Sequence, residues 1–281
     1  MKQIDNGYKH FKWGLMGVAC YLLMPSPTAN AVAVAFGGGP VAGCTLDAPT
    51  FTYTCETSPT TSVDAVAIAV NYIVTVTGTG NSDDNLHAFT AALGVDSVVN
   101  ANLISASTVA LGVGAYVNRD IVAGSTVAMG VGAYVVRNLT AGTTVALGVG
   151  SYVGRNLTAG TTVALGADSF VCLNLTGLTV AMGAGSYVHR NLTATTATLG
   201  AGAYVNRDLT AVTATMGAKG YVGGNIDAYT ATLGAGACYG TALPAPTTLT
   251  LGAGVVSGVA SCPLLRPQTR CSPIIYGREN Y

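Results

Sequence analysis

The chain contains few charged residues, few aromatic residues and only one tryptophan. Of its 281 residues 9% are charged, 7% are aromatic, and basic and acidic side chains balance at a net charge of zero. A balanced charge provides no electrostatic attraction for nucleic acid, so we expect no nucleic-acid partner. A composition dominated by small residues, with 37 glycines and only five phenylalanines, disfavours an ordinary thick core and favours a thin one.

Groups of residues that carry catalysis are also missing. Neither His87 nor His189 has a catalytic or metal-ligand spacing to Cys, Asp or Glu, and there is no nucleophile elbow or phosphate loop. Asp83 and Asp84 lie in a polar segment that resembles a surface loop more than a calcium site. We therefore expect no enzyme activity, no catalytic residues, no metal and no cofactor.

The first residues have the pattern of an export signal. Three lysines precede an apolar run from Trp13 to Met24, and the small-residue sequence Ala29-Asn30-Ala31 follows. The run of about a dozen residues is shorter than the roughly 20 needed to cross a bilayer. We expect residues 1–31 to be a signal peptide, the mature chain to begin near Val32, and the protein to be secreted without a membrane span.

A short repeat fills most of the remaining chain. Leu-Gly or Met-Gly pairs recur every 17 or 18 residues, beginning at Leu93, Leu111, Met129, Leu147, Leu165, Met182, Leu199, Met216, Leu233 and Leu251. A fixed short period of this kind predicts a solenoid. The array covers residues 93–256, which leaves residues 32–92 for an N-terminal cap with irregular first coils and residues 257–281 for a C-terminal cap.

Each repeat contains three short alternating segments separated by Gly or Asn turns. In the copy that starts at Leu147, the inward positions are expected to be Leu147, Val153, Leu157, Ala159 and Val163, and the outward positions Tyr152, Thr158, Thr162 and Ala164. The predicted fold is therefore all-β: a single parallel β-solenoid of about ten rungs with a roughly triangular cross-section. Rungs stack at about 4.8 Å.

Stacking brings equivalent residues of successive rungs into columns. One column is polar: Asn102, Asp120, Asn138, Asn156, Asn174, Asn191, Asp208 and Asn225. These residues tolerate a left-handed turn and hydrogen-bond along a stack, so we predict a structural role. Four of them begin Asn-Leu-Thr sequons, which we interpret as by-products of the repeat.

Two more columns are aromatic and basic. The aromatic column, interrupted by Cys238, is Tyr116, Tyr134, Tyr152, Phe170, Tyr187, Tyr204 and Tyr221. It is predicted to stiffen the rod, with a platform for sugar rings or for another rod as the alternative. The basic column, interrupted by Leu173, is Arg119, Arg137, Arg155, Arg190 and Arg207. It is predicted to be a solvated corner, or a site for a bridging anion, with Asp120 and Asp208 relieving part of its repulsion.

The fourth column consists of threonines three positions before each Leu-Gly or Met-Gly pair. In the later rungs a second threonine follows two positions on, as in Thr213-Ala-Thr215. Outward residues are then about 6.6 Å apart along a strand and about 4.8 Å apart across rungs, close to repeat distances of water in ice. The candidate surface-binding residues are Thr144, Thr162, Thr179, Thr196, Thr198, Thr213, Thr215, Thr230, Thr232, Thr248 and Thr250.

These rows resemble two groups of known proteins. Thr213-Ala-Thr215 and its equivalents look like the ice-binding faces of β-solenoid antifreeze proteins. The run from Thr198 to Ala211 is similar to rungs of bacterial ice-binding adhesion-type solenoids and of bactofilin-type polymer-forming β-helices. The likeness extends over residues 93–255 and implies a solenoid fold, ice as a partner in the first case and self-assembly in the second.

Six cysteines remain in the mature chain, and an exported protein can oxidise them. Cys44 and Cys55 bracket one short segment and Cys262 and Cys271 another, so each pair can staple a cap. Cys172 and Cys238 lie four rungs apart, too far for a bridge. We predict that Cys238 pairs with Cys262 or Cys271 and that Cys172, on the outside of the rod, is free or bonded between molecules.

The sequence thus predicts a secreted, non-enzymatic β-solenoid whose flat Thr/Ala face binds ice or an ordered water layer. An alternative is a structural subunit that assembles side by side or end to end into an extracellular filament or matrix. A third hypothesis is a carbohydrate-binding surface along the tyrosines and arginines.

Overall fold

A computed structural model describes residues 44–47, 52–57, 66–67, 73–78, 81–82, 86–240, 248–258 and 271. All of them belong to the second of two compact units, which spans Val32–Tyr281; the first is Met1–Ala31. The predicted signal peptide and the loop with Asp83 and Asp84 lie outside the described residues. No helix long and apolar enough to span a bilayer occurs in the part of the chain that the structure describes.

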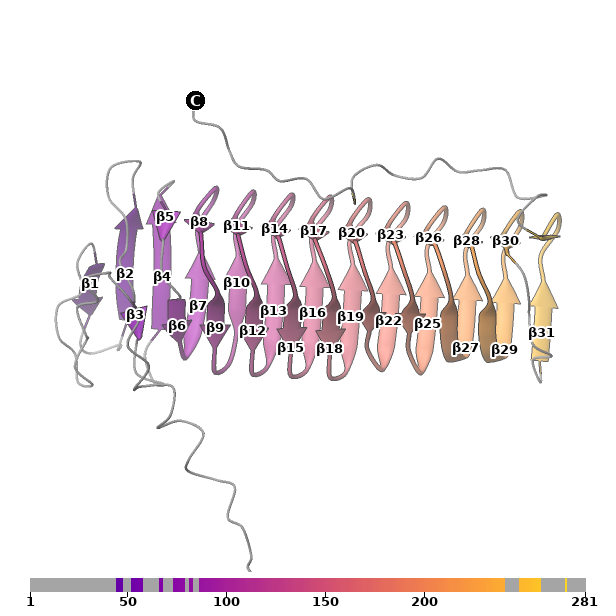
Figure 1. Ribbon diagram of the computed structural model, residues 1–281, viewed down its shortest axis with the longest axis horizontal. Helices are drawn as coiled ribbons and strands as arrows, with labels where there is room; N and C mark the ends of the chain where they lie inside the picture. Colours follow the sequence, from indigo (N-terminus) through magenta and orange to yellow (C-terminus); the bar gives the residue numbers. More distant parts are fainter. Residues whose placement is uncertain are drawn as a thin grey trace, which may run out of the picture. The chain divides into compact units, whose positions relative to one another are not determined.

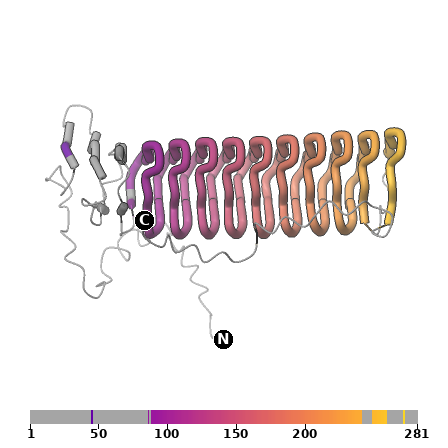
Figure 2. Tube along the Cα trace, turned by 90° about the horizontal axis from the view of Figure 1, so that it is seen from above, coloured from indigo at the N-terminus to yellow at the C-terminus, as the bar shows by residue number. Residues whose placement is uncertain are grey.

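The predicted parallel β-solenoid is confirmed (Figure 1), and successive coils follow one another along a single direction (Figure 2). Each turn contributes three strands, which we name after their outward or inward residues. The threonine strands precede the Leu-Gly or Met-Gly pairs: β7 (Thr90–Leu93), β10 (Val109–Leu111), β13 (Thr126–Met129), β16 (Thr144–Leu147), β19 (Thr162–Leu165), β22 (Thr179–Met182), β25 (Thr196–Leu199) and β31 (Thr248–Leu251). The second halves of β27 (Leu209–Met216) and β29 (Ile226–Leu233) complete this set, which agrees with the predicted number of about ten rungs.

The tyrosine strands form a separate, narrow sheet of eleven strands. They are β5 (Asn81–Ser82), β8 (Val98–Val99), β11 (Tyr116–Val117), β14 (Tyr134–Val135), β17 (Tyr152–Val153), β20 (Phe170–Val171), β23 (Tyr187–Val188), β26 (Tyr204–Val205), β28 (Tyr221–Val222), β30 (Cys238–Tyr239) and β32 (Val256–Ser257).

The leucine strands form the third side of each turn and join the threonine strands in one broad sheet. They are β6 (Leu86–Ala88), β9 (Leu103–Ser105), β12 (Ile121–Ala123), β15 (Leu139–Ala141), β18 (Leu157–Ala159), β21 (Leu175–Thr176) and β24 (Leu192–Thr193), followed by the first halves of β27 and β29. Within β27 the outward neighbours Val212 and Thr213 are consecutive, which marks a corner between the two sides.

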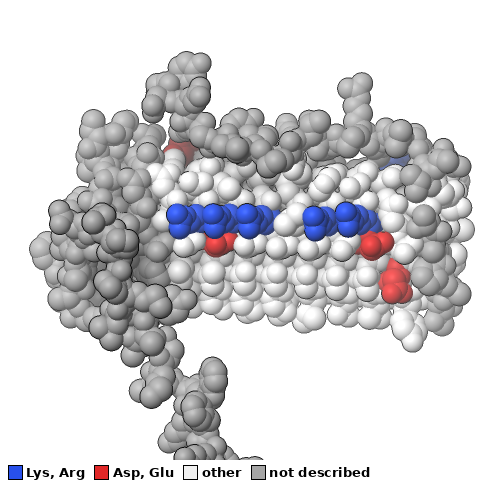
Figure 3. Space-filling view, viewed as in Figure 1, with Lys and Arg blue, Asp and Glu red and all other residues white. Residues whose placement is uncertain are grey.

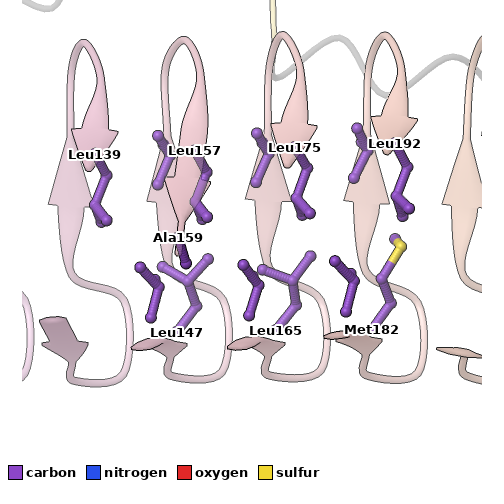
Figure 4. Close-up of a cluster of buried hydrophobic side chains, with 14 of the residues drawn as sticks. Leu139, Leu147, Leu157, Ala159, Leu165, Leu175, Met182 and Leu192 are labelled. Atoms are coloured by element: carbon purple, nitrogen blue, oxygen red, sulfur yellow. The ribbon is translucent and has the colours of Figure 1, made fainter. Parts of the chain in front are cut away.

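A continuous core runs along the rod between the three sides. The inward residues predicted for the rung at Leu147 are all buried, and Tyr152, Thr158, Thr162 and Ala164 all point outward. Equivalent leucines, such as Leu139, Leu157, Leu175 and Leu192, stack on one another along the rod (Figure 4). Each leucine therefore removes its neighbours in the adjacent rungs from water, and no rung has a complete core by itself.

The glycine of each Leu-Gly or Met-Gly pair is required by the close stacking of rungs. A Cβ atom on Gly148 would lie 2.6 Å from the carbonyl carbon of Gly130 in the preceding rung. The glycine two positions later has a different role, because Gly150 has a φ of 65° and a Cβ atom there would have no other atom within 4 Å. Asp168 occupies the equivalent left-handed position in the next rung, as Asp residues can.

The Asn/Asp column forms the predicted hydrogen-bond ladder. The side-chain oxygen of each member from Asn102 to Asp208 accepts a hydrogen bond from the backbone N–H of the next member, at 2.9–3.3 Å. Asn138, Asn156 and Asn174 also donate from Nδ2 to the preceding member. None of these residues has a positive φ, so hydrogen bonding, and not the expected tolerance of a left-handed turn, accounts for the column.

The two ends of the described stack differ. At the N-terminal end β1 (Cys44–Asp47) pairs antiparallel with β2 (Thr52–Thr57), which stacks in parallel on β4 (Ile73–Gly78); β3 (Val66–Ala67) stacks on β6. Cys44 and Cys55 are direct partners in the antiparallel pair. At the other end, Leu249 and Leu251 of β31 are 42% and 53% exposed, whereas Ala231 and Leu233 in the preceding rung are buried.

Candidate functional sites: the threonine face and the tyrosine–arginine groove

The predicted threonines form one surface, which we call the threonine face. Strand pairing brings Thr144, Thr162, Thr179, Thr196, Thr213, Thr230 and Thr248 into a single in-register column. The second column contains Thr198, Thr215, Thr232 and Thr250 in the later rungs and alanines in the earlier ones. All eleven threonines are half-buried or exposed, and the positions between the columns are buried as far as Ala231.

The hydroxyl groups of this face have no partners among the described residues. Thr143 and Thr161, at the neighbouring corner, donate instead to the carbonyl oxygens of Ser125 and Thr143, at 3.0 and 2.9 Å. The eleven threonines of the face make no comparable intramolecular hydrogen bond in the part of the chain that is described. Their hydroxyls are therefore free to bind water or another surface, while their methyl groups limit how many positions a water molecule can occupy.

A second column of threonines lies on the leucine strands, and of its members the sequence analysis predicted an outward position for Thr158 alone. It consists of Thr140, Thr158, Thr176, Thr193 and Thr210, all exposed. The Asn-Leu-Thr repeats contain its signal, because each of the four sequons ends in one of these threonines. The corner separates this column from the threonine face. Substitutions in it can therefore serve as controls for substitutions in the threonine face, because the side chain is the same.

The threonine face is bordered by exposed apolar residues. Val95, Val113, Val131 and Val149 at the turns of the earlier rungs are each at least half exposed, and Leu178, Val212 and Tyr229 lie at the corner in later rungs. Thus the threonine face combines threonine, alanine and valine in the earlier rungs, whereas in the later rungs it has two threonine columns.

The rings of the aromatic column stack on one another along the rod. Tyr134 and Tyr152 stack with ring centroids 4.3 Å apart and an interplanar angle of 2°, and Tyr204 and Tyr221 do the same. Tyr187 is only 2% exposed. Each stacked ring covers one face of the next, so the packing fits the predicted stiffening role. The platform for sugar rings stays an untested alternative.

Burial has the expected effect on these phenols. It raises the pKa of Tyr187 to about 12, with a further contribution from nearby Tyr221. The pKa of Tyr204 is also raised, first by burial and then by its neighbours Tyr221 and Tyr187. The phenols of Tyr187 and Tyr204 therefore stay uncharged at neutral pH.

The arginines form a row along the rod with one interruption (Figure 3). Four of them line the same groove as Tyr134 and Tyr152. All five are exposed, and none forms an ion pair with a described carboxylate. Asp120 and Asp208 directly follow two of these arginines in the sequence, and each carboxylate also accepts a hydrogen bond from the backbone of the following rung. That these two residues relieve part of the repulsion stays a prediction. The row is therefore a line of positive charge that has no ion-pair partner among the described residues.

A groove of about 600 Å³ lies between the tyrosines and the arginines. We call it the tyrosine–arginine groove and define it by its walls and floor: Tyr134, Tyr152, Val136, Gly154, Cys172, Leu173, His189, Asn206, Arg137, Arg155, Arg190, Arg207 and Cys271. His189 accordingly lines a groove, where its ring nitrogen Nδ1 is 2.8 Å from the Tyr187 hydroxyl. Burial, then Arg190 and Arg207, lowers its pKa.

A disulfide joins Cys172 to Cys271 with a Cα–Cα distance of 5.3 Å. Cys172 faces outward, as predicted, since it follows the inward Val171, but it is neither free nor bonded between molecules. The expected Cys262–Cys271 staple is also wrong, and Cys271 lies beside β20 instead of over the last coil. Cys238 is disulfide-bonded as well, so Cys262 remains its predicted partner.

The rung of β20 departs from the repeat at three outward positions at once. Phe170 replaces the usual tyrosine and Leu173 replaces the usual arginine. Cys172 occupies the variable position between them, which is Gly154 in the preceding rung. The bridge supplies the reason, because Cys271 lies against this rung and apolar neighbours suit its approach. The sulfur of Cys172 also accepts a hydrogen bond from the Tyr152 hydroxyl at 2.9 Å, since a disulfide sulfur carries no hydrogen to donate. Simultaneous departures within one rung are thus a sequence signal of a contact from outside the repeat.

Comparison of the chain with protein-family models, curated proteins and solved structures finds no match. Among the described residues there is also no group of three or more His, Cys, Asp or Glu side chains placed to hold a metal ion. Inference about function therefore rests on the threonine face and the groove.

Proposed function

We propose that the threonine face binds ice or an ordered layer of water and that the protein does so outside the cell. The observation that supports this proposal is the in-register pairing of Thr196-Ala-Thr198, Thr213-Ala-Thr215 and Thr230-Ala-Thr232. It places uncharged hydroxyl and methyl groups on a grid of about 6.6 by 4.8 Å.

Two properties of the face favour ordered water over a charged or strongly hydrated ligand. The face contains no ionisable side chain, and its hydroxyls make no hydrogen bond to other described residues. A regular grid of such groups holds water in repeated positions, so ordering water there requires little rearrangement of the protein. The later rungs, with both threonine columns, form the stronger part of the proposed site.

The test is ice-crystal shaping and thermal hysteresis by the purified mature chain. Replacing Thr213 and Thr230 by tyrosine should abolish both effects, because large rings break the flat grid. The matched control replaces Thr193 and Thr210 by tyrosine. These are also threonines in adjacent rungs, but they lie across the corner from the threonine face. This control variant should retain both ice-crystal shaping and thermal hysteresis. The proposal fails if the folded wild-type monomer does not shape ice, or if the two double variants behave alike.

A second candidate function is assembly into an extracellular filament, and it is favoured by the last coil. Leu249 and Leu251 continue buried positions of the solenoid yet are 42% and 53% exposed. A second copy that covered this end would remove them from water. Concentration-dependent light scattering tests this candidate, with Leu251→Lys expected to reduce assembly. Scattering that does not change with concentration would exclude it.

A further inference from the structure

The tyrosine–arginine groove lies apart from the threonine face and has a different chemistry. Four of its lining residues are arginines, Arg137, Arg155, Arg190 and Arg207, and these are exposed and lack ion-pair partners among the described residues. Successive arginines are one rung apart, except across the rung of Leu173. Like charges held in such a row repel one another, so an anion that bridges them is stabilised.

The arrangement suits a polymer better than a single ion. Guanidinium groups bind carboxylate or sulfate groups through two parallel N–H donors. Here the donors repeat along the groove from β14 to β26, a length of about 19 Å at 4.8 Å per rung. A linear ligand with anionic groups at regular intervals can engage several arginines at once, which raises its affinity over that of one anionic unit.

The packing of the tyrosines indicates which class of polyanion fits. Single-stranded nucleic acid is commonly bound by stacking its bases on exposed aromatic faces. In this groove Tyr134 and Tyr152 cover each other's faces at 4.3 Å, and Tyr204 directs its hydroxyl to Asn206 Oδ1 at 3.1 Å. The groove thus offers charge and polar ring edges without stacking surfaces.

We propose that the tyrosine–arginine groove binds a linear anionic polysaccharide along the rod. The arginines hold the carboxylate or sulfate groups, and the floor residues, such as Asn206, contact sugar hydroxyls. This proposal does not depend on ice binding, because it concerns different residues on a different side of the solenoid.

The experiment is titration calorimetry of the disulfide-intact protein with polygalacturonate, with heparin and with galacturonate oligomers of increasing length. Neutral dextran and single-stranded oligothymidylate serve as comparison ligands. We expect binding of at least one anionic polysaccharide, affinity that rises with oligomer length, and weakening by salt. Replacing Arg137 and Arg155 by glutamine should lower the affinity roughly tenfold or more.

The control variant is Lys219→Asn, which removes an exposed cation outside the row. Lys219 has a φ of 57°, which asparagine tolerates, so this variant should fold and bind as the wild type does. Circular dichroism verifies folding of both variants. The proposal is overturned if neither anionic polysaccharide binds, if the double arginine variant binds as tightly as the wild type, if dextran binds equally well, or if oligothymidylate binds more tightly.

Discussion

Replacing Gly148 by alanine should destabilise the stack far more than its small size suggests. The added Cβ atom would lie 2.6 Å from both the carbonyl carbon and the oxygen of Gly130 and 2.8 Å from the Met129 oxygen. Ordinary van der Waals contact begins at 3.4 Å, so the two rungs must separate locally by about 0.8 Å, the difference between 3.4 and 2.6 Å.

That separation weakens hydrogen bonds on both sides of the turn. Gly148 N–H donates to the Met129 carbonyl, and Gly166 N–H donates to the Leu147 carbonyl, each at 2.8 Å. Overpacking of this kind costs about 1–3 kcal/mol, and each weakened hydrogen bond contributes up to about 1 kcal/mol more. We expect a loss of about 2–4 kcal/mol for Gly148→Ala.

Gly150→Asn is the matched control. Gly150 has a left-handed backbone conformation but open space around its Cβ position, so asparagine there should cost less than about 1 kcal/mol. Thermal unfolding gives the order of stability, and hydrogen exchange at the Gly148 and Gly166 amides locates the opening. Equal stability of the two variants would refute the proposed role of close stacking.

Three further predictions concern other parts of the rod. Cys172→Ser should lower the melting temperature of the oxidised protein, because a disulfide that closes a loop of about 100 residues stabilises the folded state by about 4–5 kcal/mol in the chain-entropy model. Non-reducing peptide mapping of the wild type should recover Cys172 joined to Cys271. Asn156→Ala should cost about 1–2 kcal/mol in urea unfolding, because it leaves the Asn174 N–H unpaired and removes the hydrogen bond to Asn138. Asn156→Asp should cost less than Asn156→Ala, because it keeps the acceptor for Asn174 and loses only the Nδ2 donor to Asn138. Because the pKa of His189 is lowered in the folded protein, the unfolded chain binds a proton more readily than the folded one. The free energy of unfolding should therefore fall as pH decreases from above 6.5 through the native pKa. His189→Asn should flatten this pH dependence of stability, and an unchanged pH dependence in the variant would contradict the prediction.

The repeat period predicted most of the fold because each rung must reproduce the contacts of the last. The burial of Leu147 and Val153 and the in-register Thr213 and Thr230 follow directly from the alternating pattern of one repeat. The Asn column was also predictable, although its basis is hydrogen bonding alone. These features depend on neighbours one rung away, which the sequence spacing specifies.

Features that depend on contacts outside the repeat were not predictable in the same way. The pairing of Cys172 with Cys271 depends on the path of a segment that has no period, so sequence distance gave no basis for choosing it. The groove likewise depends on the side-chain rotamers of Tyr134 and Arg137, which the repeat spacing does not specify. Stacking of tyrosine rings one rung apart, by contrast, follows from the spacing of the repeat, and the pairs Tyr134–Tyr152 and Tyr204–Tyr221 confirm it.

The bridge between Cys172 and Cys271 also limits how the array can grow by gene duplication. Cys172 and the last described coil are five rungs apart, about 24 Å at 4.8 Å per rung. The thirteen residue steps from Gly258 to Cys271 span at most about 43–47 Å when fully extended. The tail by itself would therefore allow about four more repeats between Cys172 and the last described coil, and the predicted Cys238–Cys262 bridge would tighten this limit. The tail thus bounds the length of the part of the rod after Cys172, and repeats before Cys172 are not bounded in this way.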